Sequence, residues 1–340
     1  MQERAALGIF GAGRNGSTLL MRLLDGSPDL WIYPIELRFL ELRDWLASEP
    51  GSLDRWAEGQ LAELRETYLG RLEGENEPHA DPLAALRASS GPPERRLEAF
   101  LDGVRAAYAP PGLSPEAIHG FKTIEVEHPG RYLELFPGLR LLHLVRDPSA
   151  NYASLKRTDM VVKRKPFWFQ GGDVLRTFLE RRWLPHARYV LGVGRRDPAR
   201  HLLVRYEELC SEPTRVVTEI CDWLGIRPPA EPELQTALGG RHLREQPNRA
   251  PEHPVADLQR PADGVVTPRE AAFIELATAE LAAELGYERN GGATPSRARL
   301  LRSWLPLDRW ETMNVDSRLR QGRALLARRL YVYRKLLSRP

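Results

Sequence analysis

A short apolar segment, a glycine-rich turn and a leucine-rich segment follow one another near the start of the chain, and this succession restricts the fold most. Residues 9–20 read I-F-G-A-G-R-N-G-S-T-L-L, and the apolar run at 5–10 has the length of a short buried strand. In a strand, glycine loop and helix of this kind, several backbone N–H groups and a helix N-terminus point at one anion. The sequence therefore predicts a first loop that binds a phosphate-like group.

The loop differs from a P-loop at the position of the lysine. Gly11 and Gly16 have the spacing of the pattern G-x-x-x-x-G-K-[ST], but Ser17 stands where the lysine belongs. Arg14 supplies a positive charge from inside the loop instead. An ordinary tight turn is the alternative interpretation, but such a turn would not require arginine, serine and threonine at these positions. We therefore expect a phosphate-like ligand that is held differently from a nucleoside triphosphate.

Further apolar segments alternate with helical patterns along the chain. Residues 139–145 read L-R-L-L-H-L-V and are followed by Arg146, and residues 202–204 form a third apolar run. This alternation predicts an α/β protein with a P-loop-like three-layer fold, in which helices flank a central, mostly parallel sheet. Ligands of such sheets bind at the carboxyl ends of the strands, where the first loop and Arg146 would lie.

The expected organisation is one domain over residues 1–289 and a linker with a basic helical extension over 290–340. Residues 36–110 are predicted to be mainly amphipathic helices, beginning with a helix over 36–47. The last twenty residues carry six Arg or Lys and no acid. Such a tail fits a helix on a membrane surface or a partner subunit, and it equally fits a terminal helix docked on its own chain.

Composition narrows the class of protein further. With 340 residues, of which 42% are hydrophobic, the chain can bury a substantial core. A net charge of only +3 does not indicate a nucleic-acid-binding protein. Two cysteines give neither a disulfide framework nor a metal-binding pattern, and neither a leader sequence nor an apolar run of membrane-spanning length is evident. We expect a cytoplasmic protein, whose oligomeric state the sequence leaves open.

Three segments in order carry a family resemblance. They are G-A-G-R-N-G-S-T-L-L-M-R-L-L-D-G-S-P at 11–28, F-P-G-L-R-L-L-H-L-V-R-D-P-S-A-N-Y-A-S-L at 136–155 and V-R-Y-E-E-L-C-S-E-P at 204–213. Together they resemble the sulfotransferases that use 3′-phosphoadenosine-5′-phosphosulfate (PAPS), over about residues 5–250 and with the bacterial and Golgi-type branch most similar. The resemblance implies in-line transfer of a sulfuryl group from PAPS to a hydroxyl of a small-molecule or glycan acceptor, with no metal.

The resemblance also implies which residues hold the donor. The 5′-phosphosulfate would contact the loop residues Gly13, Arg14, Asn15, Gly16, Ser17 and Thr18. Asn15 and Ser17 depart from the Arg-Ser-Gly-Thr-Thr of that branch but preserve size and hydrogen bonding. Arg14 would neutralise charge on the bridging oxygen as the sulfuryl group leaves.

The 3′-phosphate of PAPS would be bound by a second set of residues. The resemblance assigns it to Arg146 and Ser154, which are eight positions apart, as the family pattern requires. Arg249, in an Asn-x-x-Arg-like loop, is a further candidate for the nucleotide. For Arg146 the alternative is a solvated ion pair at the end of a strand.

The candidate catalytic base is Glu36, in the sequence Y-P-I-E-L-R-F. A glutamate in a Pro-x-Glu setting after the first helix serves as base in related sulfotransferases, and it would accept the proton of the acceptor hydroxyl. The alternative for Glu36 is a charge at a helix N-terminus after Pro34. Lys122 resembles the lysine of the family's Lys-Thr-Pro segment, with Ile124 in place of the proline, and would steady the sulfuryl group or the acceptor. The rival bases are His119, Glu125 and His128.

Other features leave alternatives open. The helices predicted over 36–110 are expected to shape the acceptor site. The basic and aromatic stretch at 156–169 predicts either a lid or part of that site, or else a solvated loop. A P-loop kinase-like phosphotransferase is a second possible function, although the missing lysine and the lack of an evident Mg²⁺-binding acid other than Asp147 argue against it. A catalytically silent nucleotide-binding relative is a third.

Overall fold

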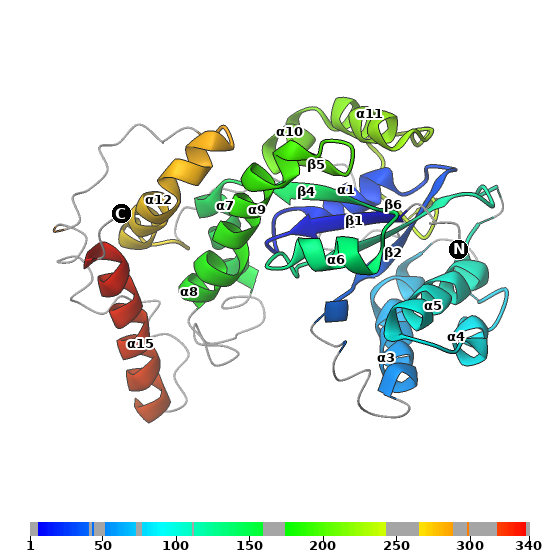
Figure 1. Ribbon diagram of the computed structural model, residues 1–340, viewed down its shortest axis with the longest axis horizontal. Coiled ribbons are helices and arrows are strands. Elements are labelled where there is room, and N and C mark those ends of the chain that lie inside the picture. The colour runs from blue at the N-terminus through cyan, green and yellow to red at the C-terminus, as the bar shows by residue number, and fades with distance from the viewer. Residues whose placement is uncertain are drawn as a thin grey trace. The chain divides into compact units, whose positions relative to one another are not determined.

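A computed structural model of the chain describes residues 6–40, 43, 52–72, 77–110, 112–158, 174–242, 265–287, 298 and 318–337 (Figure 1). The chain divides into two compact units. The first comprises Met1–Gly11, Gly16–Leu144 and Gly194–Gln259, and the second comprises Ala12–Asn15, Val145–Val193 and Arg260–Pro340.

A five-stranded sheet forms the centre of the first unit (Figure 1). Its strands are β1 (Ala6–Gly11), β2 (Leu30–Glu36), β3 (Ile118–Thr123), β4 (Leu139–Val145) and β5 (His201–Arg205). Their order is β2-β3-β1-β4-β5; β1 is parallel to both β3 and β4, and β2 is parallel to β3. The predicted P-loop-like α/β fold with a central parallel sheet flanked by helices is confirmed.

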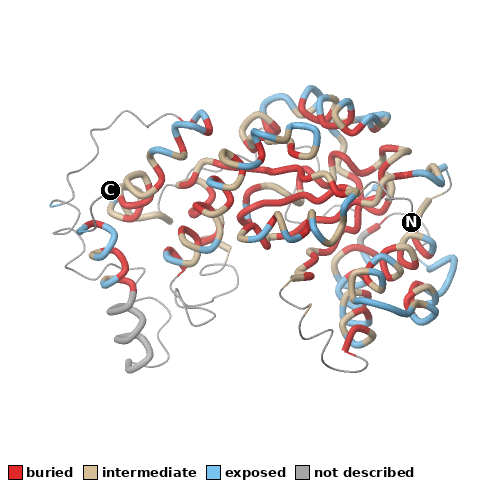
Figure 2. Tube along the Cα trace, viewed as in Figure 1, coloured by how far each residue is buried: buried red, intermediate tan, exposed pale blue. Residues whose placement is uncertain are grey.

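Strand β1 lies in the middle of the sheet because it is apolar on both faces. Leu7, Ile9 and Phe10 are completely buried, and most residues of the strands are buried (Figure 2). Buried parallel strands have this continuous apolar character. The ring of Phe10 packs edge-on against that of Tyr132, with the ring centroids 5.1 Å apart. This packing fixes the carboxyl end of β1, at Gly11, where the glycine loop begins.

Strands β2 and β3 were not predicted, and the expected helix over 36–47 is wrong at its start because Glu36 ends β2. Pro34 weakens the strand pattern of β2, but β2 is an edge strand, where proline is tolerated. Its pairing with β3 also shifts register between Ile32 and Glu36. In β3 the apolar signal is diluted by Gly120, where an added Cβ would lie 2.9 Å from Cγ1 of Ile32.

Helices cover the sheet of the first unit. They are α1 (Ser17–Leu24), α3 (Ser52–Thr67), α4 (Ala84–Ala88), α5 (Pro93–Tyr108), α6 (Pro129–Leu135), α10 (Tyr206–Ser211) and α11 (Pro213–Leu224). Helix α1 contacts β1, β2 and β3, while α3 and α5 contact β2. The helical character expected for 36–110 is confirmed for α3 to α5. The unit also contains a hairpin of β6 (Thr236–Ala237) and β7 (Arg241–His242).

The second unit is helical in its described parts. Its helices are α7 (Pro148–Lys156), α8 (Val174–Phe178), the π-helical turn η4 (Leu179–Trp183), α9 (Leu184–Gly192), α12 (Pro268–Glu284) and α15 (Arg318–Leu337). Helix α12 packs against α7 and α9. It begins with a capping box, in which the Thr267 side chain accepts from the backbone N–H of Glu270 and the Glu270 carboxylate accepts from that of Thr267.

Helix α15 contains the basic tail, and it is docked within the second unit. Tyr331, Val332 and Leu336 are buried at the spacing of one helix face, and the rings of Tyr331 and Phe273 meet edge-on at 6.0 Å. Of the alternatives given for the basic tail, a terminal helix docked on its own chain agrees with the position of α15. Membrane contact by the tail and a domain boundary at 290 stay predictions. In the described part of the chain, no helix combines the length and apolar character needed to cross a membrane.

Candidate functional site

The glycine loop follows β1 directly and leads into α1, as predicted. Gly13, Arg14 and Gly16 have positive φ values of 77°, 58° and 99°. Arg14 is a non-glycine residue in the left-handed region, a conformation that costs about 1–3 kcal/mol and is concentrated at functional sites. The chain turns sharply through these residues before Ser17 begins the helix.

Gly16 is required where it stands because a tyrosine ring occupies the space of its missing side chain. A Cβ on Gly16 would lie 2.2 Å from Cδ2 of Tyr206, which is far inside van der Waals contact. Tyr206 is buried and begins α10, directly after β5. The Tyr206 ring therefore supports the backbone at the start of α1.

Replacing Gly16 with alanine should lower the free energy of unfolding by about 1–3 kcal/mol, because the new methyl group meets the Tyr206 ring and the φ of 99° is unfavourable for alanine. Urea denaturation measures the loss. The control is Gly59→Ala in α3, where nothing lies within 4 Å of the new Cβ and helix propensity favours alanine. Equal stability of the Gly16→Ala variant and the unmodified chain would contradict the packing.

The N-terminus of α1 has the features of an anion-binding helix end. Its N-cap is Gly16, and no side chain of the described residues caps it. The first intrahelical bond runs from the backbone N–H of Leu20 to the carbonyl of Gly16, at 3.0 Å. Ser17 and Thr18 form the first turn and are partly exposed. Backbone N–H groups of an uncapped first turn, together with two hydroxyls, provide donors for an anion.

In the second unit, the loop segment 12–15 is anchored on α7 and on the residue that follows β4. Asn151, which is completely buried in α7, donates from Nδ2 to the carbonyl of Gly13 at 2.8 Å. The guanidinium of Arg146 donates to the carbonyl of Arg14 at 3.2 Å. The indole N–H of Trp183 in turn donates to the carbonyl of Arg146 at 3.1 Å. These bonds hold the loop carbonyls, so the backbone conformation of the loop is fixed by charged and polar neighbours.

The residues of the second unit that are predicted to bind the donor differ in their exposure to solvent. Arg14 is exposed, whereas Asn15 is completely buried. Arg146 is largely buried just before α7, and Ser154 is partly exposed within α7. Arg249 and most of the 156–169 stretch lie outside the described residues.

Asn151 was missed by sequence reasoning, although a signal was present. Helix α7 is buried over most of its length, and an asparagine in such a helix needs a hydrogen-bond partner. Its position four residues after Asp147, the N-cap of α7 whose carboxylate accepts from the N–H of Ala150 at 2.7 Å, places it beside the start of the helix. The partner, a carbonyl of the glycine loop, is remote in sequence and was not predictable.

Glu36 and Lys122 are brought together in the first unit. They are register partners on β2 and β3, and the backbone N–H of Leu37 donates to the carbonyl of Lys122 at 2.9 Å. Lys122 is also the register partner of Ile9 on β1, so Glu36 and Lys122 both lie near the carboxyl end of β1. The Glu36 side chain is 32% exposed and accepts from Nε of Arg38 at 3.0 Å. Glu36 is therefore a strand-end carboxylate open to solvent, and its interpretation as a helix N-terminal charge is wrong.

Two of the rival bases are held in other interactions. His119 lies at the amino end of β3, away from the carboxyl edge; its Nε2 is 2.6 Å from a guanidinium nitrogen of Arg105, and its ring packs against that of Trp31. Glu125 is buried and accepts a short hydrogen bond from the hydroxyl of Tyr132. The third, His128, is the N-cap residue of α6. The choice of Glu36 as the base stays a prediction.

Comparison with known proteins gives the family. The profile of the sulfotransferase family matches residues 7–230, well over half of the chain. The chain therefore belongs to the sulfotransferase family, and it is a transferase of that class. No curated protein sequence matches the chain.

Two solved structures share its fold. The sulfotransferase domain from the curacin biosynthetic pathway is 17% identical, with a TM-score of 0.52 over 84% of this chain and 98% of that one. The sulfotransferase domain of the Synechococcus PCC 7002 olefin synthase is 23% identical, with a TM-score of 0.50 over 84% of this chain and 95% of that one. At these identities the similarity concerns the fold.

Proposed function

We propose that the protein transfers a sulfuryl group from PAPS to a hydroxyl of a small-molecule or glycan acceptor. The observation that carries the proposal is the sulfotransferase-family match over residues 7–230, which includes the glycine loop, Arg146 and the Arg205-Tyr206-Glu207 segment. The loop supports it in two ways. Its conformation suits an anion, and its positive charge comes from Arg14 rather than from a P-loop lysine.

The proposed reaction is an in-line displacement at sulfur. The acceptor oxygen forms a bond to sulfur while the bond from sulfur to the bridging oxygen of PAPS breaks, and 3′-phosphoadenosine-5′-phosphate leaves. The hydroxyl proton passes to the carboxylate of Glu36, whose partly exposed side chain at a strand end is accessible to a substrate. Arg14 stabilises the charge on the departing phosphate, and Lys122 stabilises the sulfuryl oxygens in transit.

The donor is held at its two ends by different residues in this proposal. Gly13, Asn15 and Gly16 shape the loop around the 5′-phosphosulfate, with hydroxyl contacts from Ser17 and Thr18. Arg146 and Ser154 bind the 3′-phosphate, and Arg249 contributes to binding of the nucleotide.

Replacing Arg146 with alanine should weaken the binding of 3′-phosphoadenosine-5′-phosphate by about 10- to 100-fold, because a charge-assisted hydrogen bond to phosphate is worth about 1.5–3 kcal/mol. Isothermal titration calorimetry measures the affinity. Arg188→Ala, at an exposed position of α9, is the control for loss of one positive charge. Unchanged affinity in the Arg146→Ala variant would remove Arg146 from the donor site.

Sulfate transfer from radiolabelled PAPS to a panel of hydroxyl compounds, with products identified by mass shift, tests the function itself. The reaction is expected to continue in EDTA. Among the described residues, no group of three or more His, Cys, Asp or Glu side chains is placed to hold a metal ion. Mg²⁺-dependent turnover of ATP would instead indicate a kinase-like phosphotransferase, and donor binding without transfer to any acceptor would indicate a catalytically silent relative.

We expect the protein to lie in the cytoplasm. Both cysteines, Cys210 and Cys221, are buried thiols that form no disulfide. Burial raises the pKa of the Cys221 thiol to about 12, with Asp222 and Asp29 adding to the effect, so this thiol stays protonated at neutral pH. Contact of the basic tail with a membrane surface is a separate proposal, which co-sedimentation with anionic vesicles would test.

A further inference from the structure

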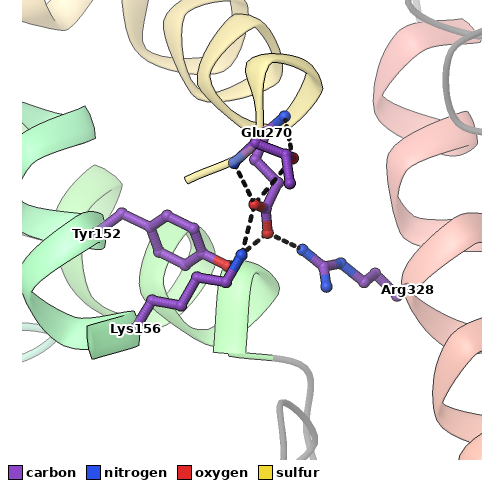
Figure 3. Close-up of polar contacts among 5 residues, drawn as sticks. Tyr152, Lys156, Glu270 and Arg328 are labelled. Carbon is purple, nitrogen blue, oxygen red and sulfur yellow. Dashed lines mark hydrogen bonds and ion pairs between the residues drawn. The ribbon is translucent and has the colours of Figure 1, made fainter. Parts of the chain in front are cut away.

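A buried cluster of charges joins three helices of the second unit (Figure 3). At its centre is the carboxylate of Glu270, in the first turn of α12, with a completely buried side chain. One carboxylate oxygen accepts from Nζ of Lys156 at 2.7 Å. The other accepts from the Arg328 guanidinium at 2.5 Å and from the Tyr152 hydroxyl at 3.1 Å. Lys156 and Tyr152 belong to α7, and Arg328 belongs to α15.

The three charges are almost entirely removed from water. The side chains of Lys156 and Arg328 are each only 1% exposed. Burial alone would raise the pKa of Glu270, but the charges of Arg328 and Lys156, with the hydrogen bonds from Lys156 and Thr267, hold it at about 2. Buried charges of this kind are stable only in a narrow geometry, because each must keep its partners. The cluster therefore fixes how α7, α12 and α15 meet.

Helix α7 presents two different faces to its neighbours. Asn151 and Ser154 are three residues apart and share one face, on which Asn151 binds the glycine-loop carbonyl. Tyr152 and Lys156 are four residues apart and share another face, which meets Glu270. At 3.6 residues per turn, the two faces point roughly 150° apart around the helix axis. Helix α7 is thus held from one side by the charge cluster while its other side carries Ser154.

We propose that Glu270 and Arg328 are positioning residues for the donor: through Lys156 and Tyr152 they set the rotation of α7, and so they place Ser154 for the 3′-phosphate of PAPS. This inference rests on the proposed function, which assigns Ser154 to that phosphate. It gives the basic C-terminal helix a role in donor binding that acts through α7. Ser154 lies only two residues before Lys156, so the last turn of α7 transmits the effect.

Helix α15 is docked through specific side-chain contacts. Arg328 donates to Glu270. One turn later the Tyr331 ring meets Phe273 of α12 edge-on, and the guanidinium of Arg176 lies over the Tyr331 ring, 5.6 Å from its centre. By contrast, Arg334 on the same helix is exposed. Arg328, which is buried, and Arg334, which is exposed, therefore make a matched pair for an experiment.

The experiment compares Arg328→Met, Arg328→Lys and the control Arg334→Met in the full chain. Arg328→Met leaves the Lys156–Glu270 ion pair in place, so this variant is expected to fold. Calorimetry measures the affinity for 3′-phosphoadenosine-5′-phosphate and for adenosine 5′-phosphate, which lacks the 3′-phosphate, well below the melting temperature of each variant. The ratio of the two affinities isolates the contribution of the 3′-phosphate.

The ratio should fall by about tenfold in Arg328→Met, since small displacements of a binding group have effects of this size or larger. It should recover in part in Arg328→Lys and remain unchanged in Arg334→Met. A lower melting temperature with an unchanged ratio in Arg328→Met would overturn the inference and leave α15 a purely stabilising element. Absence of a preference for the 3′-phosphate in the unmodified chain would instead contradict the proposed function.

Discussion

Replacing Glu36 with glutamine should lower the rate of sulfuryl transfer by about 10²- to 10⁴-fold, the usual contribution of a general base. Glutamine preserves the size of the side chain but cannot accept the hydroxyl proton. Because the donor contacts assigned to the glycine loop and Arg146 are unaffected, the affinity for 3′-phosphoadenosine-5′-phosphate should stay within about twofold. Single-turnover transfer from radiolabelled PAPS separates the chemical step from binding.

Two controls distinguish the effect of the Glu36 carboxylate from the loss of its ion pair with Arg38 and from the loss of a surface charge. Arg38→Met removes the partner at 3.0 Å but retains the Glu36 carboxylate. Glu219→Gln removes a carboxylate of similar setting, an exposed ion pair with Arg215 on α11. A loss in either control as large as that in Glu36→Gln would show that the effect comes from surface charge, and full activity in Glu36→Gln would assign the proton to another group.

Replacing Glu270 with glutamine should reduce the free energy of unfolding by about 3–5 kcal/mol, the range found when one partner of a buried ion pair is removed. Lys156 and Arg328 would then remain buried with no counter-charge from residue 270. Glu280→Gln, on the exposed part of α12, is the matched control and should change stability little. Urea denaturation monitored by tryptophan fluorescence measures both.

The same carboxylate predicts how stability depends on pH. The pKa of Glu270 is about 2 in the folded chain and 4.5 as a reference, so the unfolded chain takes up a proton first as the pH falls. Its contribution is complete above pH 4.5 and is lost progressively between pH 4.5 and 2, by about 3 kcal/mol in total. The Glu270→Gln variant should lack this part of the acid slope. An identical slope in the two proteins would contradict the assignment.

The parts of the fold with strong local signals were predictable from the sequence. Strands β1 and β4 are apolar on both faces, and α11 ends at Gly225 in the left-handed conformation, with a φ of 71°, as its glycine suggests. Strand β2 was hidden by Pro34, and its identity depends on an edge position in the sheet that no local pattern reveals. Because β2 was not recognised, Glu36 was expected at the start of a helix. The choice of Glu36 as candidate base did not depend on that helix.

The candidate site was predictable where one motif carries it, and not where distant segments meet. The glycine loop and its phosphate-binding character follow from residues 11–18 alone. The pairing of Glu36 with Lys122 requires the β2–β3 register, and the bond from Asn151 to Gly13 requires the packing of α7. The Glu270 cluster unites residues from three helices, and composition gives no signal for such a contact.

The contact between Gly16 and the Tyr206 ring has a consequence for how sequences of this kind can diverge. Two separate constraints act on position 16: the Tyr206 ring fills the space of a side chain, and a φ of 99° strains any residue other than glycine. A smaller side chain at position 206 would remove only the first constraint. Related chains with a loop of this shape should therefore keep glycine at this position even where the aromatic ring is lost, and this can be checked from sequences alone.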